Sequence, residues 1–293
     1  MTEPVRVGLV TCRELPEPDP DQNLLLAALH GAGVDVELVA WDGSTAHGIS
    51  SFDCCVLRSC WNYHESPGDF RQWIDSAGRL TRLWNPEPIV TWNLHKRYLE
   101  SLAAAGLPTV PTAWFRKGQD APLRETAESN DWSDIVVKPA ISASSYRTHR
   151  FRLGDGQFNE AQAALDDLLR DRDAMVQPYV PGVETLGERA VLWIDSEITH
   201  TIRKTSRFAG DVEAVSQAVT ASEAEREVAL RSVAVAAAET GVSPLYARVD
   251  LMPDAQGDPM VSELELIEPS LYLRQSPAAL DRFVRAIATT PAS

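Results

Sequence analysis

Residues 245–269 read LYARVDLMPDAQGDPMVSELELIEP, and they carry the strongest structural signal in the chain. Two apolar runs flank the turn-rich segment Ala255–Asp258, a pattern that predicts a β-hairpin with a four-residue loop. Because strand side chains alternate between two faces, Glu263 and Glu265 point to one face and the leucines beside them point to the other. The second strand is therefore acidic on one side and apolar on the other.

The pairing of the two strands concentrates charge on the acidic face. A loop of the four residues 255–258 places Asp250 opposite Glu263 and Arg248 opposite Glu265. Carboxylates this close are destabilising unless a cation lies between them, and hard divalent cations prefer oxygen ligands of this kind. A solvated hairpin face is the alternative for any single acidic strand, so the choice depends on the rest of the chain.

The overall composition is that of an acidic globular protein. A chain of 293 residues suits two or three subdomains, and 44% hydrophobic and 24% charged residues are ordinary values. The net charge of −15 argues against a nucleic acid or a membrane surface as partner. A polyanion such as ATP would need a local basic pocket and metal ions in order to bind.

The cysteines and the apolar segments bear on location. The chain lacks the spacing of a cysteine metal site or disulfide framework, so reduced thiols are expected at Cys12, Cys54, Cys55 and Cys60. The N-terminus enters a strand directly without a signal segment, and no apolar run approaches the roughly 18 residues of a membrane span. We therefore expect a cytoplasmic protein.

Lysine is scarce in this chain. Against 23 arginines there are four lysines, which are Lys96, Lys117, Lys138 and Lys204. Lysine is a compact point charge and arginine a planar fork, so the two are not equivalent at a phosphate. Each lysine is therefore a candidate for a specific role.

The first part of the chain predicts a small α/β domain with a mainly parallel sheet. Strands are expected at Val5–Val10, Val34–Ala40 and Cys54–Leu57, with a helix at Gln22–His30. Ligands bind beyond the carboxyl ends of such strands, where polar and aromatic residues follow Leu57 directly. These candidates for a small-molecule site are Arg58, Ser59, Trp61, Asn62 and Tyr63. A capping turn with a surface arginine is the alternative.

A linker and a helix are expected next. Residues 84–92 contain two prolines and read as a linker, and Asn93 is a plausible N-cap for a helix that runs to Ala105. Lys96 would then lie in the first helical turn, where a cation is disfavoured by the helix dipole unless an anion is present.

The remaining pattern alternates strands and helices. The β-branched run Ile135–Val137 leads into Lys138–Pro139 and then into the small and polar residues 141–148, which suit a flexible flap over phosphates. A plain polar loop is the alternative. Further elements are expected as strands at Ala174–Gln177, Arg189–Ile194 and Ile198–Lys204, and as helices at Gln157–Arg170, Glu223–Glu239 and Pro277–Ala288.

Six short motifs in this order resemble the ATP-grasp superfamily. They are RSCWNY (58–63), WNLHKRYL (92–99), VVKP (136–139), QPYV (177–180), TIRK (201–204) and ELELIEPSLYL (263–273). The resemblance covers roughly residues 92–270 and is nearest to the cyclo-ligase of D-cycloserine biosynthesis, with glutathione synthetases and D-alanine–D-alanine ligases more distant. It implies an α/β ATP-grasp fold with an N-terminal Rossmann-like pre-ATP-grasp domain. The implied parts are residues 1–91, a central and lid part at 92–178, and a C-terminal part with the metal site at 179–293.

The resemblance implies that three of the four lysines contact the nucleotide phosphates. Lys96 and Lys138 match the two phosphate lysines, while Lys204, with Arg203 beside it, matches the basic residue near the γ-phosphate. Arg248 matches the arginine that steadies the transferring phosphoryl group. Lys117 has no such counterpart and is expected at the surface.

The resemblance also implies a nucleotide hinge, a flap and a metal site. The adenine hinge corresponds to Gln177, Tyr179 and Val180, and the ribose carboxylate to Glu184 with Glu188 as the alternative. In the flap, Ser144 and Ser145 replace the usual glycines. Magnesium, which manganese can replace, would be held by Asp250, Glu263 and Glu265, with glutamate in place of the usual asparagine at the last position.

The implied reaction is the ATP-dependent joining of a carboxylate to an amine through an acyl phosphate, on a small amino-acid-like substrate in specialised metabolism. An intramolecular cyclo-ligase is one alternative, and an ATP-binding protein or kinase without ligation is another. The expected substrate residues are Arg58, Ser59, Trp61, Asn62, Glu268, Ser270 and Arg274. Dimerisation is usual among such enzymes, so a homodimer is a further expectation.

Overall fold

The computed structural model describes residues 4–205 and 214–290, except for the side chains of residues 44–47. Its first sheet is parallel, in the order β2 (Asp35–Ala40), β1 (Arg6–Thr11), β3 (Cys54–Leu57) and β4 (Arg82–Trp84). Helices α1 (Gln22–Gly31) and α2 (Pro67–Leu80) pack on it, and the short 3-10 helix η1 spans Ser44–Ser51. The predicted N-terminal α/β arrangement is confirmed.

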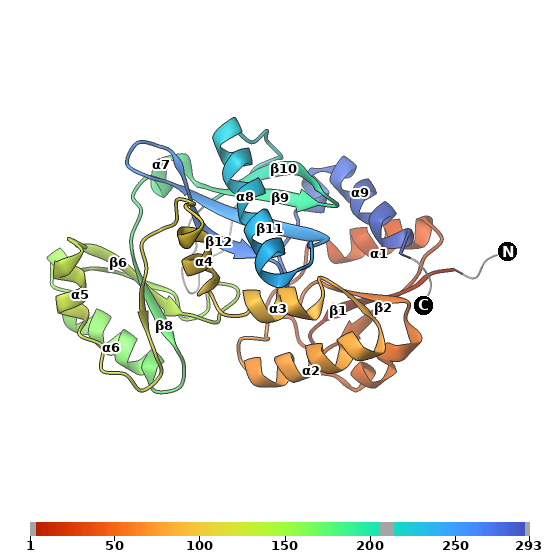
Figure 1. The fold of residues 1–293 in the computed structure, drawn as a ribbon, viewed down its shortest axis with the longest axis horizontal. Helices are drawn as coiled ribbons and strands as arrows, with labels where there is room; N and C mark the ends of the chain where they lie inside the picture. Colours follow the sequence, from red (N-terminus) through yellow and green to blue (C-terminus); the bar gives the residue numbers. More distant parts are fainter. Residues whose placement is uncertain (1–3, 206–213, 291–293) are drawn as a thin grey trace.

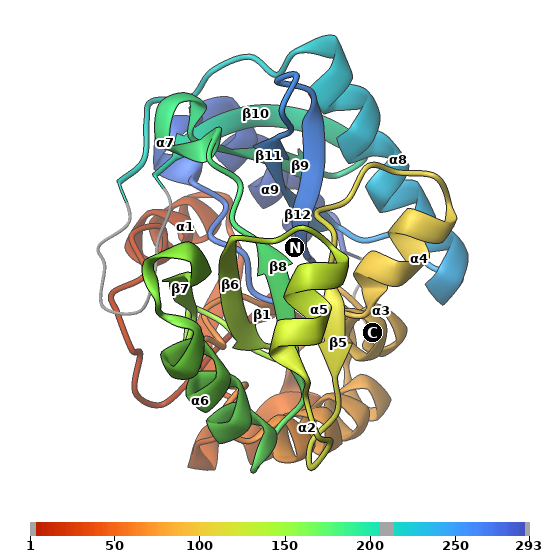
Figure 2. The ribbon, with the colours of Figure 1, turned by 90° about the vertical axis from the view of Figure 1, so that its left-hand side faces the viewer.

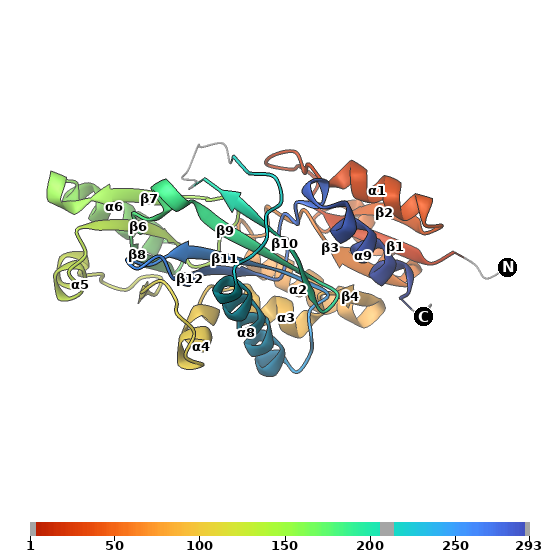
Figure 3. The same ribbon diagram turned by 90° about the horizontal axis from the view of Figure 1, so that it is seen from above.

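The second sheet is antiparallel and forms the part of the molecule farthest from the first (Figures 1 and 3). Its order is β5 (Ala113–Phe115), β8 (Ala174–Pro178), β6 (Asp134–Pro139) and β7 (His149–Arg152). Helices α5 (Leu123–Ser129) and α6 (Phe158–Leu169) cover the face that looks toward the viewer in Figure 2, and η2 (Leu153–Asp155) precedes α6. The other face is left to the interior of the molecule.

The third sheet lies between the other two (Figure 3). It is antiparallel, in the order β10 (Glu197–Lys204), β9 (Glu188–Ile194), β11 (Tyr246–Pro253) and β12 (Pro259–Glu265). Helix α8 (Glu223–Thr240) packs on it, begun by a capping box at Ser222 and ended at Gly241 with φ 74°. The chain then passes through η3 (Leu273–Gln275), and α9 (Pro277–Ala288) returns to pack on α1. Within the described residues, no helix is long and apolar enough to cross a membrane.

The prediction for residues 84–105 was wrong in two respects. The expected linker contains α3 (Glu87–Asn93), because the prolines lie around the helix start, where a missing amide proton costs nothing. Asn93 ends this helix rather than capping a new one, and α4 spans Tyr98–Ala104. Lys96 therefore lies between two helices, and the helix-dipole argument for a phosphate there does not hold.

The hairpin register at the acidic positions is as predicted, with Asp250 opposite Glu263 and Arg248 opposite Glu265. The loop and the strand pairing that produce this register differ from the prediction. Pro253 pairs with Pro259, so the loop is one residue longer than expected, and a bulge between Asp250 and Leu251 restores the register. The additional residue on β12 is Ser262, whose hydroxyl donates to the main-chain oxygen of Asp250 at 3.0 Å. The bulge keeps the carboxylates on one face.

Side chains from the α3–α4 segment satisfy the free edge of β12. The amide of Asn93 donates to the Leu264 oxygen at 2.8 Å and accepts from the Leu266 nitrogen at 2.9 Å. The Leu264 nitrogen donates to the hydroxyl of Tyr98 at 3.1 Å. Asn93 thus takes the place of a neighbouring strand beside Glu263 and Glu265.

Asn93→Ala is expected to lower the free energy of unfolding by about 3 kcal/mol, because it leaves one buried N–H and one buried C=O without partners. Urea denaturation measures this loss. The matched control is Asn130→Ala, since the exposed Asn130 makes a single bond to the Thr126 oxygen and should lose less than about 0.5 kcal/mol. Equal losses in the two variants would contradict the role given to Asn93.

Candidate active site

A cavity of about 190 Å³ lies where the three sheets meet. Strands β6 and β8 form one wall, strands β9 to β12 the other, and Trp61 and Tyr63 reach it from the first sheet. Among the described residues, six carboxylates and four cations line it, namely Glu17, Glu188, Asp250, Glu263, Glu265 and Glu268, and Lys96, Lys138, Lys204 and Arg248. So much opposed charge in one cavity is typical of a functional site.

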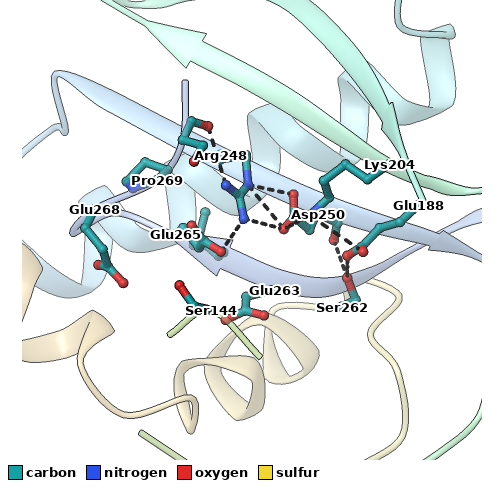
Figure 4. A network of polar contacts seen from close by, with 12 residues as sticks. Ser144, Glu188, Lys204, Arg248, Asp250, Ser262, Glu263, Glu265, Glu268 and Pro269 are labelled. Carbon is teal, nitrogen blue, oxygen red and sulfur yellow. Dashed lines mark hydrogen bonds and ion pairs between the residues drawn. The ribbon is translucent and has the colours of Figure 1, made fainter. Parts of the chain in front are cut away.

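Asp250 is the centre of the charged network (Figure 4). Its carboxylate is 2% exposed and receives hydrogen bonds from Lys204 Nζ at 2.7 Å and from Arg248 Nη2 at 3.0 Å. Burial alone would raise the pKa of Asp250, but the charges of Arg248 and Lys204 outweigh it and lower that pKa. Burial would likewise lower the pKa of Lys204, which its carboxylate neighbours instead raise.

Glu263 pairs with Lys96 across the cavity. The Lys96 ammonium also donates to the Ser142 oxygen at 3.0 Å and is 5% exposed. Burial opposes the charged form of both groups, but their attraction prevails, so the pKa of Lys96 rises and that of Glu263 falls. Lys96 therefore joins the α3–α4 segment to the acidic strand through side chains rather than through a helix end.

The negative charges of Glu265 and Glu188 are less fully compensated by neighbouring cations. Arg248 pairs with Glu265, yet burial, reinforced by Asp250 and Glu263, raises the pKa of Glu265 to about 7. Glu188 accepts from the Ser262 hydroxyl at 3.0 Å and lies 3.6 Å from Lys204, and burial raises its pKa as well. Glu188 thus lies with the acidic cluster (Figure 4) rather than at the predicted hinge.

Lys138 is the unpaired cation of the cavity. Within the described residues its ammonium makes no hydrogen bond or ion pair, although it lines the same space as Lys96 and Glu263. Burial, only partly offset by Glu263, lowers the pKa of Lys138. A half-buried ammonium without a counter-ion is a site ready for an anionic ligand.

The predicted hinge residues line the cavity along β8. Gln177 donates to the Thr112 hydroxyl at 2.9 Å, and the Tyr179 nitrogen donates to the Asp134 oxygen at 2.8 Å. The Tyr179 hydroxyl donates to Glu184 at 3.0 Å, and the Arg150 guanidinium binds the same carboxylate. Hydrogen bonds from Arg150 and Tyr179 lower the pKa of Glu184. Glu184, and not Glu188, is the carboxylate beside the hinge.

The predicted flap covers the cavity in a strained conformation. Ser144 and Ser145 line the cavity with φ of 48° and 55°, in the left-handed region that favours glycine. The Ser144 hydroxyl donates to Glu17 at 3.4 Å. The glycines of related flaps are therefore replaced at positions whose backbone geometry glycine would adopt more readily.

Of the predicted substrate residues, Trp61, Glu268 and Ser270 line the cavity. Trp61 Nε1 donates to the Glu268 main-chain oxygen at 3.0 Å, and Arg58 donates to the Pro269 oxygen at 3.1 Å. Arg58 thus supports the loop from behind, and its side chain does not reach the cavity. The position of Arg58 after a parallel strand predicted a contact with the ligand. In the structure its guanidinium is buried and binds a main-chain carbonyl, so it supports the loop instead.

Five other predicted site residues lie outside the cavity lining, and one of them is Glu184, which binds Arg150 and Tyr179. The other four have partners elsewhere: Ser59 with Asp19, Asn62 with Asp42 and Trp41, Arg274 with Pro20, and Arg203 with Thr185. Strand alternation explains why Arg203 lies outside the cavity. Its neighbour Lys204 faces the cavity, so the side chain of Arg203 must point to the opposite face of the sheet.

The sequence prediction missed several lining residues. Glu17 comes from a loop of the first domain, and Ser262 comes from the bulge. Ser142 and Thr148 lie within the predicted flap at 141–148 but were not named as site residues. Loop residues carry no periodicity, and one bulged residue in VSELE cannot be distinguished from an ordinary strand residue. Tyr63, which was predicted with Trp61 among the candidates for a small-molecule site, does line the cavity.

The acidic strand pair offers oxygen donors suited to magnesium. Within residues 4–205 and 214–290, no three Asp, Glu, His or Cys side chains form a ready-made metal cage. Each carboxylate of the predicted metal site instead pairs with a cation. Magnesium usually takes one or two carboxylates together with water and substrate phosphate oxygens, so a complete protein cage is not required. The donor chemistry fits the metal, with the ligand phosphates supplying the remaining oxygens.

Comparison with known proteins gives matches over nearly the whole chain. Residues 7–85 match the family described as the N-terminal domain of D-cycloserine synthetase DcsG. The cycloserine biosynthesis protein DcsG of Streptomyces lavendulae is 34% identical over an alignment of 281 residues, and the match covers 92% of this chain and 93% of that protein.

Solved structures agree with this. The crystal structure of D-cycloserine synthetase DcsG superposes with a TM-score of 0.88 at 33% identity, over 97% of this chain and 98% of that one. The Bacillus anthracis D-alanine–D-alanine ligase complexed with ATP gives 0.71 at 15% identity, over 98% and 97%. The ATP-grasp ligase PsnB with Mg and ADP gives 0.65 at 14%, over 99% of each chain, and these two show the fold alone.

Proposed function

The chain belongs to the ATP-grasp ligase family of D-cycloserine synthetase DcsG, and on that premise we propose that it closes a small amino acid derivative into a ring. It is an ATP-dependent, ADP-forming ligase of natural-product biosynthesis that uses ATP and magnesium. The observation that supports ring closure best is the 34% identity, which extends over nearly the full length of both chains.

The proposed reaction has two steps, phosphorylation of a carboxylate and attack by a nitrogen. A carboxylate oxygen of the substrate attacks the γ-phosphorus of ATP, the bond to ADP breaks, and an acyl phosphate forms. A nitrogen then attacks the carbonyl carbon, the C–N bond forms, and phosphate leaves while the nitrogen loses a proton. The protein positions the reacting groups and offsets charge, and no side chain need become covalently attached.

We assign the cations of the cavity to the phosphates. Lys138, whose side chain has no partner among the described residues, and Lys96 would bind the nucleotide phosphates, while Lys204 and Arg248 would face the transferring group. The flap with Ser144 and Ser145 would exclude water that otherwise hydrolyses the acyl phosphate.

The hinge residues are assigned to the adenine and the ribose of the nucleotide. The main chain at Gln177, Tyr179 and Val180 would bind adenine, and Glu184 would bind the ribose hydroxyls. Asp250, Glu263 and Glu265 would hold magnesium, which neutralises phosphate charge when bound, and manganese would substitute for it.

The test is a screen of ADP release across D- and L-amino acids and their hydroxylamine and urea derivatives, followed by product mass. A product derived from one substrate molecule supports ring closure, and a product joining two supports the intermolecular ligase, the second candidate. Phosphorylated substrate without a C–N bond would support a kinase and contradict both.

We also propose a homodimer in the cytoplasm. The four cysteines are free and buried, which suits a reducing compartment. Light scattering measures the oligomeric state.

A further inference from the structure

Glu268 differs from the other carboxylates of the cavity. It is 7% exposed and lines the cavity, yet within the described chain it has no ion pair (Figure 4). Tyr63 favours its charged form, but burial followed by repulsion from Glu265 prevails and raises the pKa of Glu268. The cation whose charge acts on it, Lys96, is already bound to Glu263.

The structure holds Glu268 in place. The main-chain oxygen of Glu268 accepts from Trp61, and the next carbonyl, that of Pro269, accepts from Arg58. Both donors are buried, so the loop is anchored to the first sheet. A fixed, buried carboxylate without a cation is unfavourable in the empty cavity and is compensated when a cation enters.

We infer that Glu268 binds a positively charged ammonium group of the substrate, beside the rings of Trp61 and Tyr63. The faces of such rings also attract cations. The inference rests on the proposed ligase function and names the substrate class, which is an amino acid whose amino group remains free.

The consequence concerns which nitrogen reacts. An ammonium held by a carboxylate stays protonated and has no lone pair, so it cannot attack the acyl phosphate. The bond must form through a second, less basic nitrogen of the substrate. The name of the related enzyme's product fits this, because D-cycloserine carries a free amino group outside its ring.

The test compares D-cycloserine with N-acetyl-D-cycloserine, which lacks the basic amine, by calorimetric titration of the protein with ADP and magnesium. The wild type is expected to bind the amine at least about 10-fold more tightly, because a hydrogen bond between two charged groups is lost on acetylation. Glu268→Gln should abolish this preference, and Glu268→Asp should retain part of it. Glutamine also imitates a protonated carboxyl, so it distinguishes a charged role from a neutral one.

Glu17→Gln is the matched comparison, since Glu17 lines the same cavity from the first domain. It should keep the preference. Lack of binding or of preference in the wild type, retention in Glu268→Gln, or loss in Glu17→Gln alone would each overturn the inference. Failure of the ligase function would appear separately, as an absence of ADP release with the preference for the amine intact.

Discussion

Lys138→Met is expected to lower kcat/KM for ATP by about 10²-fold, because a charge-assisted contact to phosphate is worth about 1.5–3 kcal/mol and the cavity further strengthens it. Among the cations that line the cavity, Lys138 alone has no partner within the described residues, so its removal leaves no carboxylate of the protein unpaired. Steady-state ADP release and calorimetric ATP binding measure the effect.

The same substitution should not destabilise the free protein. Burial lowers the pKa of Lys138, which means that folding disfavours its charged form near neutral pH. Methionine has a similar length and no charge, so thermal unfolding without nucleotide should occur at the same temperature or higher. Lys117→Met is the control, because Lys117 is exposed and should change neither quantity. An unchanged ATP affinity in Lys138→Met would contradict the phosphate assignment.

Glu263→Gln is expected to reduce ADP formation by about 10²–10³-fold at limiting magnesium, since an anionic ligand is lost and shape is retained. The substitution also leaves the buried Lys96 ammonium without its carboxylate, so a loss of stability of about 3 kcal/mol is expected as well.

The metal effect can be separated from the stability effect. The magnesium concentration for half-maximal rate should rise in Glu263→Gln, and manganese binding followed by electron paramagnetic resonance should weaken. Glu197→Gln, at an exposed ion pair with Arg282, should leave both unchanged. Unaltered ADP production by Glu263→Gln when magnesium limits the rate would show that the metal is held elsewhere.

Regular patterns allowed much of the fold to be predicted. Alternation in SELEL fixed the faces of β12, and the strand–helix–strand order gave the parallel sheet. Helix α8 and strands β9 and β10 also agree with the predicted ranges to within one residue at each end. The domain boundaries at residues 91 and 178 stay predictions.

What the sequence left undetermined depends on contacts between distant segments. Asn93 looked like a helix cap because such residues usually are, but its amide binds β12, more than 170 positions away. Arg58 was predicted to bind the substrate, but its guanidinium donates to the main-chain oxygen of Pro269 instead. The correct register of the acidic face depended on two features that compensate, the longer loop and the bulge at Ser262.

The central claim is an acyl phosphate formed on a substrate carboxylate within this cavity. The most direct measurement uses the best substrate of the ADP-release screen, labelled with oxygen-18 in its carboxylate, and mass analysis of the phosphate produced. The account predicts that each turnover transfers one labelled oxygen from carboxylate to phosphate together with ADP. Unlabelled phosphate, or AMP in place of ADP, would contradict it.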